Sequence, residues 1–450
     1  MYPEQREVLD EIIVKIRAGR IKRRTFLERA MVAGLSSTAA ISLLEACGGS
    51  SNSQGGNGAA TALVWQSEND ASSTYKALTD TFNNTVGKQK GIHVTWNNGP
   101  SDSASMLTKY TTMFRARSGS TDITSIDIIY PAQFGASGWL NEITDSQWPA
   151  SERAKYLPGP IKGNTFQGKV WAAPYRTDLG ILYYRKDLVS TPAATYDDLV
   201  SQSKSASPSK IKYGYAWQGS QYEGLVCDFV EVVHGYGGEV IDANNKIVVN
   251  SPETIQALTQ MVSWVGSISP AAVTTYTEEP SRLTWQNGDA AFMRNWPYAY
   301  SLGNDPKQSK IAGKFDIASL PYGGSGTAGH SAIGGWNLGI NAFSKNPDAA
   351  WTFIQYMLQP AAQKEGAIGA TWTTTLQSVY DDPDVQSKQP LFTKLKPILQ
   401  NALPRPVSAR YSDVTNVIQQ YVYQALKKQI TPTQAISSIE SGLKPLVTSS

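Results

Sequence analysis

The sequence TALVWQ at residues 61–66 opens the alternation of strands and helices that decides the fold. Apolar residues at helical spacing follow over residues 72–85, and IHVTW at residues 92–96 alternates as a second strand. A further helix is expected over residues 103–117, before the apolar strand IDIIY at residues 126–130. The order strand, helix, strand, helix, strand is typical of a parallel α/β sheet.

The same alternation continues toward the C-terminus. Further strands are expected at residues 180–184, 315–320 and 336–340. Further helices are expected over residues 196–203, 225–234, 252–266, 347–358 and 414–428. Thr195 and Ser251 are predicted N-caps, since a side-chain oxygen there can accept from an unpaired amide of the first turn, and Pro252 fits the first helical position.

The N-terminal segment has the features of an export signal. Arg23-Arg24-Thr25-Phe26-Leu27 resembles a twin-arginine motif, and an apolar or small stretch follows over residues 31–44, too short to span a membrane comfortably. Cys47 then stands where bacterial lipoproteins carry their acylated cysteine. We therefore expect a signal peptide over residues 1–46 and a lipidated Cys47 with a flexible tether over residues 47–60. The other interpretation is an amphipathic N-terminal helix with a chance cysteine.

Length and charge limit the remaining possibilities. Without its first 46 residues the chain is longer than one hydrophobic core usually organises, so two lobes are expected. A formal net charge of +3 over 450 residues gives no electrostatic reason to expect nucleic acid as a partner. With Cys47 assigned to the anchor, Cys227 is the other cysteine of the chain and is expected to be buried.

Motifs for catalysis and metal binding are weak. No Gly-Lys pair is followed by Ser or Thr, so a phosphate-binding P-loop is absent from the sequence. His234 has helical spacing from Glu231 and Cys227, which could form a metal cluster, but their apolar neighbours favour an ordinary packed helix. We expect no metal and no cofactor.

Polar and aromatic side chains instead gather where strands end or loops turn. They include Glu68, Asn69, Asp127, Tyr175, Asp178, Glu278, Trp296 and Trp336. In open α/β folds ligands bind beyond the carboxyl ends of strands, where carboxylates can accept from sugar hydroxyls and Trp can cover a pyranose face. This pattern suggests a sugar site. The alternative is that loops are polar because they are solvated, and that the 12 Trp residues serve the core.

Seven phrases of the sequence, in order across about residues 61–440, point further. They are residues 122–130, 133–140, 173–188, 217–225, 287–298, 334–336 and 404–411. They resemble the extracellular solute-binding proteins of carbohydrate ABC importers, in particular the trehalose/maltose-binding branch. The resemblance implies an α/β, two-lobe periplasmic-binding-protein-like fold of type II, with the ligand cleft between lobes joined by crossing segments. We expect residues 61–176 and 313–341 in the N-terminal lobe, and residues 177–312 and 342–450 in the C-terminal lobe.

The resemblance also implies roles for individual residues. Acceptors of sugar hydroxyls would be Glu68 and Asp127 from the first lobe, Asp178 and Tyr175 from the hinge side, and one of Glu278 or Glu279, with Glu223 and Asn69 as further candidates. Trp296 and Trp336 would stack on the sugar, and Gly335 would allow close backbone approach. Arg410 would donate to ring hydroxyls. Arg176 departs from the pattern, since the family is often aromatic or small there.

The resulting hypothesis is a monomeric, lipid-anchored receptor outside the cytoplasm. It would capture a di- or oligosaccharide and deliver it to the membrane permease of an ABC importer, and it would not be an enzyme. One rival is a secreted glycoside hydrolase that uses two carboxylates, such as Asp127 and Asp178. The other is a binding protein for a non-sugar solute, such as a glycerophosphodiester, which Arg176 would suit.

Overall fold

The computed structural model describes residues 60–447, apart from residues 71, 101–102, 207–210, 243 and 371. The chain divides into two units, Met1–Ala59 and Ala60–Ser450. The predicted signal peptide and Cys47 lie outside the described residues, as does the tether up to residue 59. Among the described residues, no helix combines the length and apolarity that a bilayer crossing requires.

A six-stranded sheet organises the first lobe, in the order β12-β6-β11-β3-β1-β2. Its strands are β1 (Thr61–Gln66), β2 (Ile92–Asn97), β3 (Ile123–Asp127), β6 (Ala173–Leu179), β11 (Ile333–Ile340) and β12 (Thr373–Thr374). β1 pairs in parallel with β2 and β3, which confirms the parallel arrangement predicted for residues 61–130. β11 joins from the C-terminal half and runs antiparallel to both β3 and β6.

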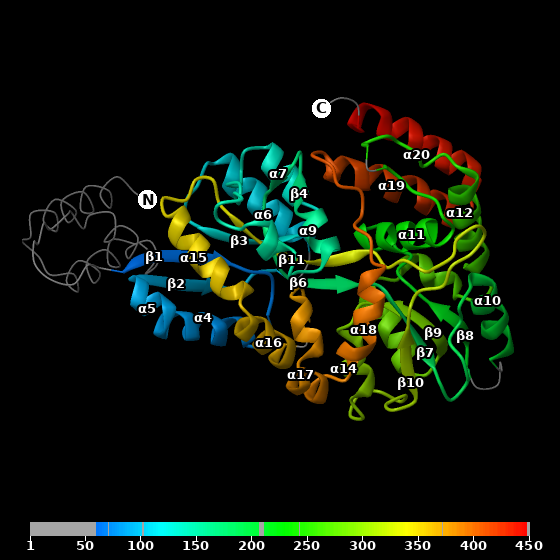
Figure 1. Cartoon of the computed structure of the whole chain (residues 1–450). Coiled ribbons are helices and arrows are strands. Elements are labelled where there is room, and N and C mark those ends of the chain that lie inside the picture. Colours follow the sequence, from blue (N-terminus) through cyan, green and yellow to red (C-terminus); the bar gives the residue numbers. More distant parts are fainter. Residues whose placement is uncertain are drawn as a thin grey trace, which may run out of the picture. The chain divides into compact units, whose positions relative to one another are not determined.

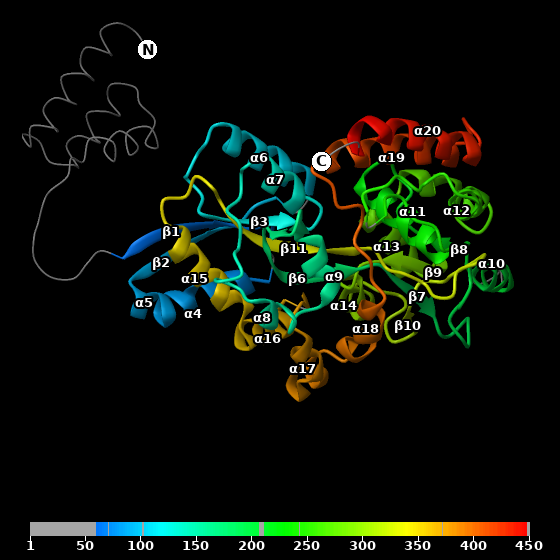
Figure 2. The same ribbon diagram turned by 45° about the horizontal axis from the view of Figure 1, so that its top comes forward.

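Helices cover both faces of this sheet (Figures 1 and 2). On one face lie α6 (Ser103–Arg115), α7 (Pro131–Ala136) and α9 (Pro158–Gly163). On the other lie α4 (Thr74–Asn84), α5 (Val86–Lys90), α15 (Pro347–Leu358) and α16 (Pro360–Gly369). The remaining elements around the first lobe are α8 (Ala150–Arg153), β4 (Thr165–Phe166), β5 (Lys169–Val170), η2 (Gln377–Asp381), α17 (Pro383–Lys388) and α18 (Leu391–Gln400).

A four-stranded sheet, in the order β10-β7-β9-β8, organises the second lobe. Its strands are β7 (Ile181–Arg185), β8 (Tyr213–Ala216), β9 (Ala290–Asn295) and β10 (Phe315–Ala318). The helices of this lobe are α10 (Tyr196–Ser205), α11 (Glu223–Gly235), α12 (Pro252–Trp264), η1 (Ala271–Thr275), α13 (Glu278–Gln286), α14 (Ala299–Asn304), α19 (Tyr411–Leu426) and α20 (Pro432–Val447). α19 and α20 pack side by side over α11 and α12 (Figure 2). The expected two-lobe α/β architecture is therefore present.

The division of the chain between the lobes differs from the predicted one in two segments. β10 pairs with β7, so residues 315–318 belong to the second lobe and not to the first. α15 and α16 contact β1, β6, β11, β12 and α4, and η2, α17 and α18 pack after them. Residues 347–400 therefore belong to the first lobe and not to the second. The reason is that sheet edges and apolar helix faces, which are distant in sequence, decide where each element packs.

Three crossing segments connect the lobes. β6 continues into β7 through Gly180, β10 returns to β11 over residues 319–332, and residues 401–410 lead from α18 to α19. A Cβ on Gly180 would lie 1.9 Å from Oε1 of Glu231, so the first crossing passes too close to a buried carboxylate for any larger residue. The crossings bring the ends of the first-lobe strands up to the second lobe (Figure 1).

Candidate functional site

Several predicted residues meet because strand ends of the first sheet lie at the lobe boundary. Asp127 ends β3, and Asp178 lies next to the last residue of β6. β11 runs between these two strands and places Trp336 opposite Asp127 on one side and Arg176 on the other. The sheet register therefore brings together residues that are about 50 to 200 positions apart in the sequence.

Glu68 is buried just beyond the end of β1, and its carboxylate accepts hydrogen bonds from other side chains of the protein. The Tyr175 hydroxyl lies 2.9 Å from both carboxylate oxygens, Tyr75 donates a further hydrogen bond, and Arg176 Nε lies 3.0 Å from Oε1. Burial, followed by the Glu68 charge, raises the pKa of Tyr175 well above its usual value. Tyr175 thus stays a neutral donor that fixes the Glu68 carboxylate. Asn69 is exposed and bonds to Asn98, outside this group.

Arg176 also reaches Asp178, with Nη1 3.0 Å from Oδ2. Burial raises the pKa of Asp178, and the opposing effect of the Arg176 charge only partly offsets it. The unexpected arginine therefore joins Glu68 and Asp178 in one ion-paired group, which we call the Arg176 triad.

Arg405 forms a second such group, the Arg405 triad, and it spans the lobes. Its Nη1 lies 2.6 Å from Glu223 on α11, and its Nη2 lies 3.4 Å from Asp127 on β3. Tyr411 and Thr415 each donate to Glu223 at 2.5 Å. Arg405 Nε is buried and has no hydrogen-bond partner in the described part of the chain. A buried donor of this kind is unfavourable unless a ligand accepts from it.

Arg410 lies apart from this site, contrary to its predicted role. Its side chain is 53% exposed and pairs with Asp413 at 2.8 Å, three residues along α19. The residue that the sequence analysis missed is Arg405, which lies five positions earlier in the same segment, residues 404–411. The available signal was its setting between Pro404 and Pro406, which holds the backbone extended across the lobe boundary.

Trp296 and Glu278 come from the second lobe. Trp296 Nε1 donates to Glu278 at 3.3 Å, and the Arg294 guanidinium carbon lies 4.1 Å from the centroid of the Trp296 ring. Arg294 is itself fully buried in ion pairs with Asp228 and Glu231. The Arg294 guanidinium thus covers one face of the indole, and the Trp296 side chain is half-buried. Stacking of Trp296 on a sugar stays a prediction.

The glycines of β11 allow this close approach. Gly335 has a φ of +115°, and a Cβ there would lie 2.5 Å from the carbonyl oxygen of Arg176. A Cβ on Gly334 would lie 3.1 Å from Asp178 and 3.2 Å from the Trp296 ring. The backbone conformation at position 335 and the close approach of Arg176 thus require a glycine. Trp336 is 7% exposed, so most of its side chain is buried against the sheet.

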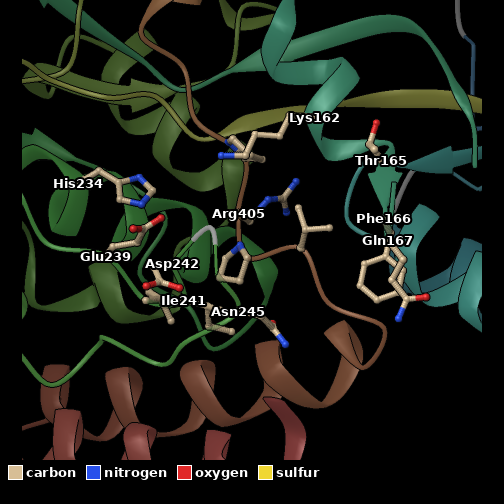
Figure 3. A pocket seen from close by; sticks show the side chains of 14 residues that line it. Lys162, Thr165, Phe166, Gln167, His234, Glu239, Ile241, Asp242, Asn245 and Arg405 are labelled. Carbon is tan, nitrogen blue, oxygen red and sulfur yellow. The ribbon is translucent and has the colours of Figure 1, made fainter. Parts of the chain in front are cut away.

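A cavity of about 330 Å³ lies beside Arg405 and is lined by both lobes (Figure 3). The lining includes Lys162 and Phe166 from the first lobe, His234 and Glu239 from the second, and residues 404–407 of the crossing segment. Burial lowers the pKa of His234 to about 4, with smaller contributions from His330 and Lys162, so its imidazole is neutral near pH 7.

His234 and Glu231 do not form the metal cluster that their spacing allowed. His234 faces the cavity, whereas Glu231 pairs with Arg294. Cys227 is buried, as predicted. Within the described ranges no group of three or more His, Cys, Asp or Glu side chains has a geometry that could hold a metal ion.

Comparison with known sequences gives consistent matches over most of the chain. The family model of bacterial extracellular solute-binding proteins matches residues 65–364. A probable ABC transporter-binding protein of Deinococcus radiodurans is 36% identical over 358 residues, which cover 76% of this chain and 84% of that protein. A maltotriose-binding protein of Pyrococcus abyssi is 26% identical over 285 residues, or 61% of this chain and 58% of that protein.

Solved structures agree with these matches. Maltose-bound MalE3 of T. maritima has a TM-score of 0.76 and 38% sequence identity, and the match covers 86% of this chain and all of that chain. The GacH receptor of Streptomyces glaucescens has a TM-score of 0.74 at 23% identity, with coverages of 86% and 98%, and shows the fold alone.

Proposed function

Since this chain belongs to the bacterial extracellular solute-binding proteins, we propose that its ligand is a di- or oligosaccharide of the trehalose/maltose class. The family makes it a sugar-binding component of an ABC transporter and not an enzyme. The names of its relatives support the class, because one is a maltotriose-binding protein and another structure holds maltose. The expected family and two-lobe fold are confirmed, and a hydrolase is excluded by the family.

The observation that carries this proposal is the ion pairing of Arg405 with both lobes. Its guanidinium joins Asp127 of the first sheet to Glu223 of the second lobe, and Trp336 lies beside Asp127 in the sheet register. A sugar that accepts from Arg405 and donates to these carboxylates would contact both lobes at once. Such a ligand favours the closed state, which a permease can then recognise.

Asp178, Glu278 and Trp296 would complete the binding site, and the buried Glu68 and Trp336 would support it from within the first lobe. The phosphodiester alternative loses its support, because Arg176 is already paired with two carboxylates. A phosphate would need an unpaired guanidinium, and it would face carboxylates of its own charge. The geometry thus favours a ligand rich in hydroxyl groups.

We further propose that the export signal and Cys47 make the protein a lipoprotein on the outer face of the cell membrane. The basis is the sequence of residues 17–49 alone. A monomer tethered in this way would meet the permease subunits by diffusion within the membrane plane. Mass spectrometry of the membrane-extracted protein, with a Cys47→Ser variant as the control, tests the acylation.

A calorimetric titration of the full chain tests the sugar site. Maltose, trehalose, maltotriose and glycerophosphocholine are compared, and at least one saccharide should bind and raise the melting temperature. Arg405→Ala should weaken that binding at least tenfold, as truncation of a buried arginine often does. Arg410→Ala is the matched control and should bind as the unaltered protein does. Binding of glycerophosphocholine alone, or equal effects of the two variants, would contradict the assignment.

A further inference from the structure

Three buried arginines lie in or directly behind the candidate site, and the guanidinium of each pairs with two carboxylates. The groups are Arg176 with Glu68 and Asp178, Arg405 with Asp127 and Glu223, and, behind Trp296, Arg294 with Asp228 and Glu231. If both its carboxylates are ionised, the Arg405 group carries a net charge of −1. In the other two groups burial raises the pKa of Asp178 and of Asp228, which favours the neutral acid there. Asp127 and Glu223 of the Arg405 group were both predicted to face the ligand, so this excess negative charge would lie at the proposed binding site.

Glu278 adds to this excess. No ion pair from a described Lys, Arg or His side chain reaches its carboxylate, which accepts a hydrogen bond from Trp296 Nε1 at 3.3 Å. The neighbouring Glu279 differs, because it is exposed and pairs with Arg282. Burial, followed by the Glu278 charge, raises the pKa of Tyr222 well above its usual value, so the Tyr222 hydroxyl stays protonated beside Glu278.

Two buried donors in the same region await an acceptor. Arg405 Nε is without a partner although its side chain is only 4% exposed, and the Tyr222 hydroxyl beside Glu278 has no hydrogen bond of acceptable geometry within the described residues. Hydroxyl oxygens of a sugar can accept from both. A neutral sugar leaves the charge excess in place, however, because hydroxyl groups donate hydrogen bonds but carry no charge.

On the basis of the proposed sugar-binding function, we propose that this site selects saccharides that carry a protonated amine over their neutral counterparts, and that Glu278 holds the ammonium group. The ammonium donates to the Glu278 carboxylate and neutralises its negative charge at a partly buried position. Charge-assisted hydrogen bonds are stronger than those between neutral groups. The hydroxyl groups occupy the Arg405 and Arg176 triads.

Calorimetric titration of the full chain with matched ligand pairs tests this inference. The pairs are trehalose with 2-amino-2-deoxytrehalose and maltose with 2-amino-2-deoxymaltose, in a mildly acidic buffer that keeps the amine protonated. For whichever disaccharide binds, the amine form should bind at least tenfold more tightly, which corresponds to about 1.4 kcal/mol. Glu278→Gln should reduce that ratio to near one, whereas Glu279→Gln should leave the ratio unchanged.

Each result is decisive. Equal or tighter binding of the neutral sugar overturns the amine preference and leaves the sugar-binding function intact. An amine preference that survives Glu278→Gln overturns the role of Glu278. Binding of no saccharide in either form contradicts the proposed function itself, and the inference fails with it.

Discussion

At the scale of single residues, burial decides how much an arginine ion pair contributes to the stability of the fold. Arg294 is almost completely buried between Asp228 and Glu231, at 2.9 and 2.5 Å, whereas Arg410 pairs with Asp413 at the surface. Removing one partner of a buried ion pair leaves uncompensated charges inside the protein. An exposed pair is screened by water and salt, and it contributes little.

These two arginines give a matched prediction. Arg294→Leu should lower the free energy of unfolding by about 3–5 kcal/mol, because two buried carboxylates lose their counter-ion. Arg410→Leu should lower it by less than about 1 kcal/mol. Urea denaturation followed by circular dichroism measures both values. Similar losses for the two variants would contradict the burial assigned to Arg294.

At the scale of elements, helix starts follow local chemistry. Thr195 forms a capping box with Asp198, in which each side chain accepts from the other residue's backbone amide at 3.0 Å. Ser251 likewise accepts from the Thr254 amide, and Pro252 follows it in the first turn. Both caps were predicted from sequence and are confirmed.

The capping box allows a test of α10. Thr195→Ala should lower the free energy of unfolding by about 1 kcal/mol, because the Asp198 amide loses its acceptor. Ser205→Ala, at the exposed end of the same helix, keeps the box and should change stability by at most about 0.5 kcal/mol. Thermal and urea denaturation of the pair measure the difference. A larger loss of unfolding free energy for Ser205→Ala than for Thr195→Ala would contradict the stabilising role of the Thr195 cap.

At the scale of the whole molecule, polar contacts besides the Arg405 triad join the two lobes. One of them joins Gln133 of α7 to the start of α19, where Gln133 Oε1 accepts from the Ser412 amide at 3.1 Å and from its hydroxyl at 2.9 Å. Contacts that exist only when the lobes are together stabilise that arrangement, and so they also support ligand binding.

Gln133→Ala should therefore weaken sugar binding by roughly three- to tenfold without touching the ligand, since the lost hydrogen bonds contribute on the order of 1 kcal/mol. Calorimetry gives the affinity, and small-angle scattering of the sugar-free protein should show a larger radius of gyration. Gln147→Ala is the control, because its contacts with Thr144 stay within the first lobe. Unchanged affinity and unchanged radius would show that this contact does not favour closure.

Much of the fold was accessible from the sequence because its signals are local. The strand at residues 61–66 and the helix at residues 347–358 have the predicted bounds, since apolar periodicity and flanking breakers act within a few residues. The strand predicted at residues 126–130 is instead β3 at Ile123–Asp127, followed by a turn. β6, β8 and β9 escaped prediction, and each gains its stability from neighbouring strands.

The sequence by itself thus determined the family, the α/β class and the presence of carboxylates and tryptophans at strand ends. Only the tertiary structure decided which side chains meet. Arg405 pairs with carboxylates of both lobes, whereas Arg410, at the start of α19, pairs with Asp413 at the surface. Tyr175 serves Glu68, which lies 107 positions away. Such pairings follow from sheet register and lobe packing, which depend on contacts between distant parts of the chain that no local pattern encodes.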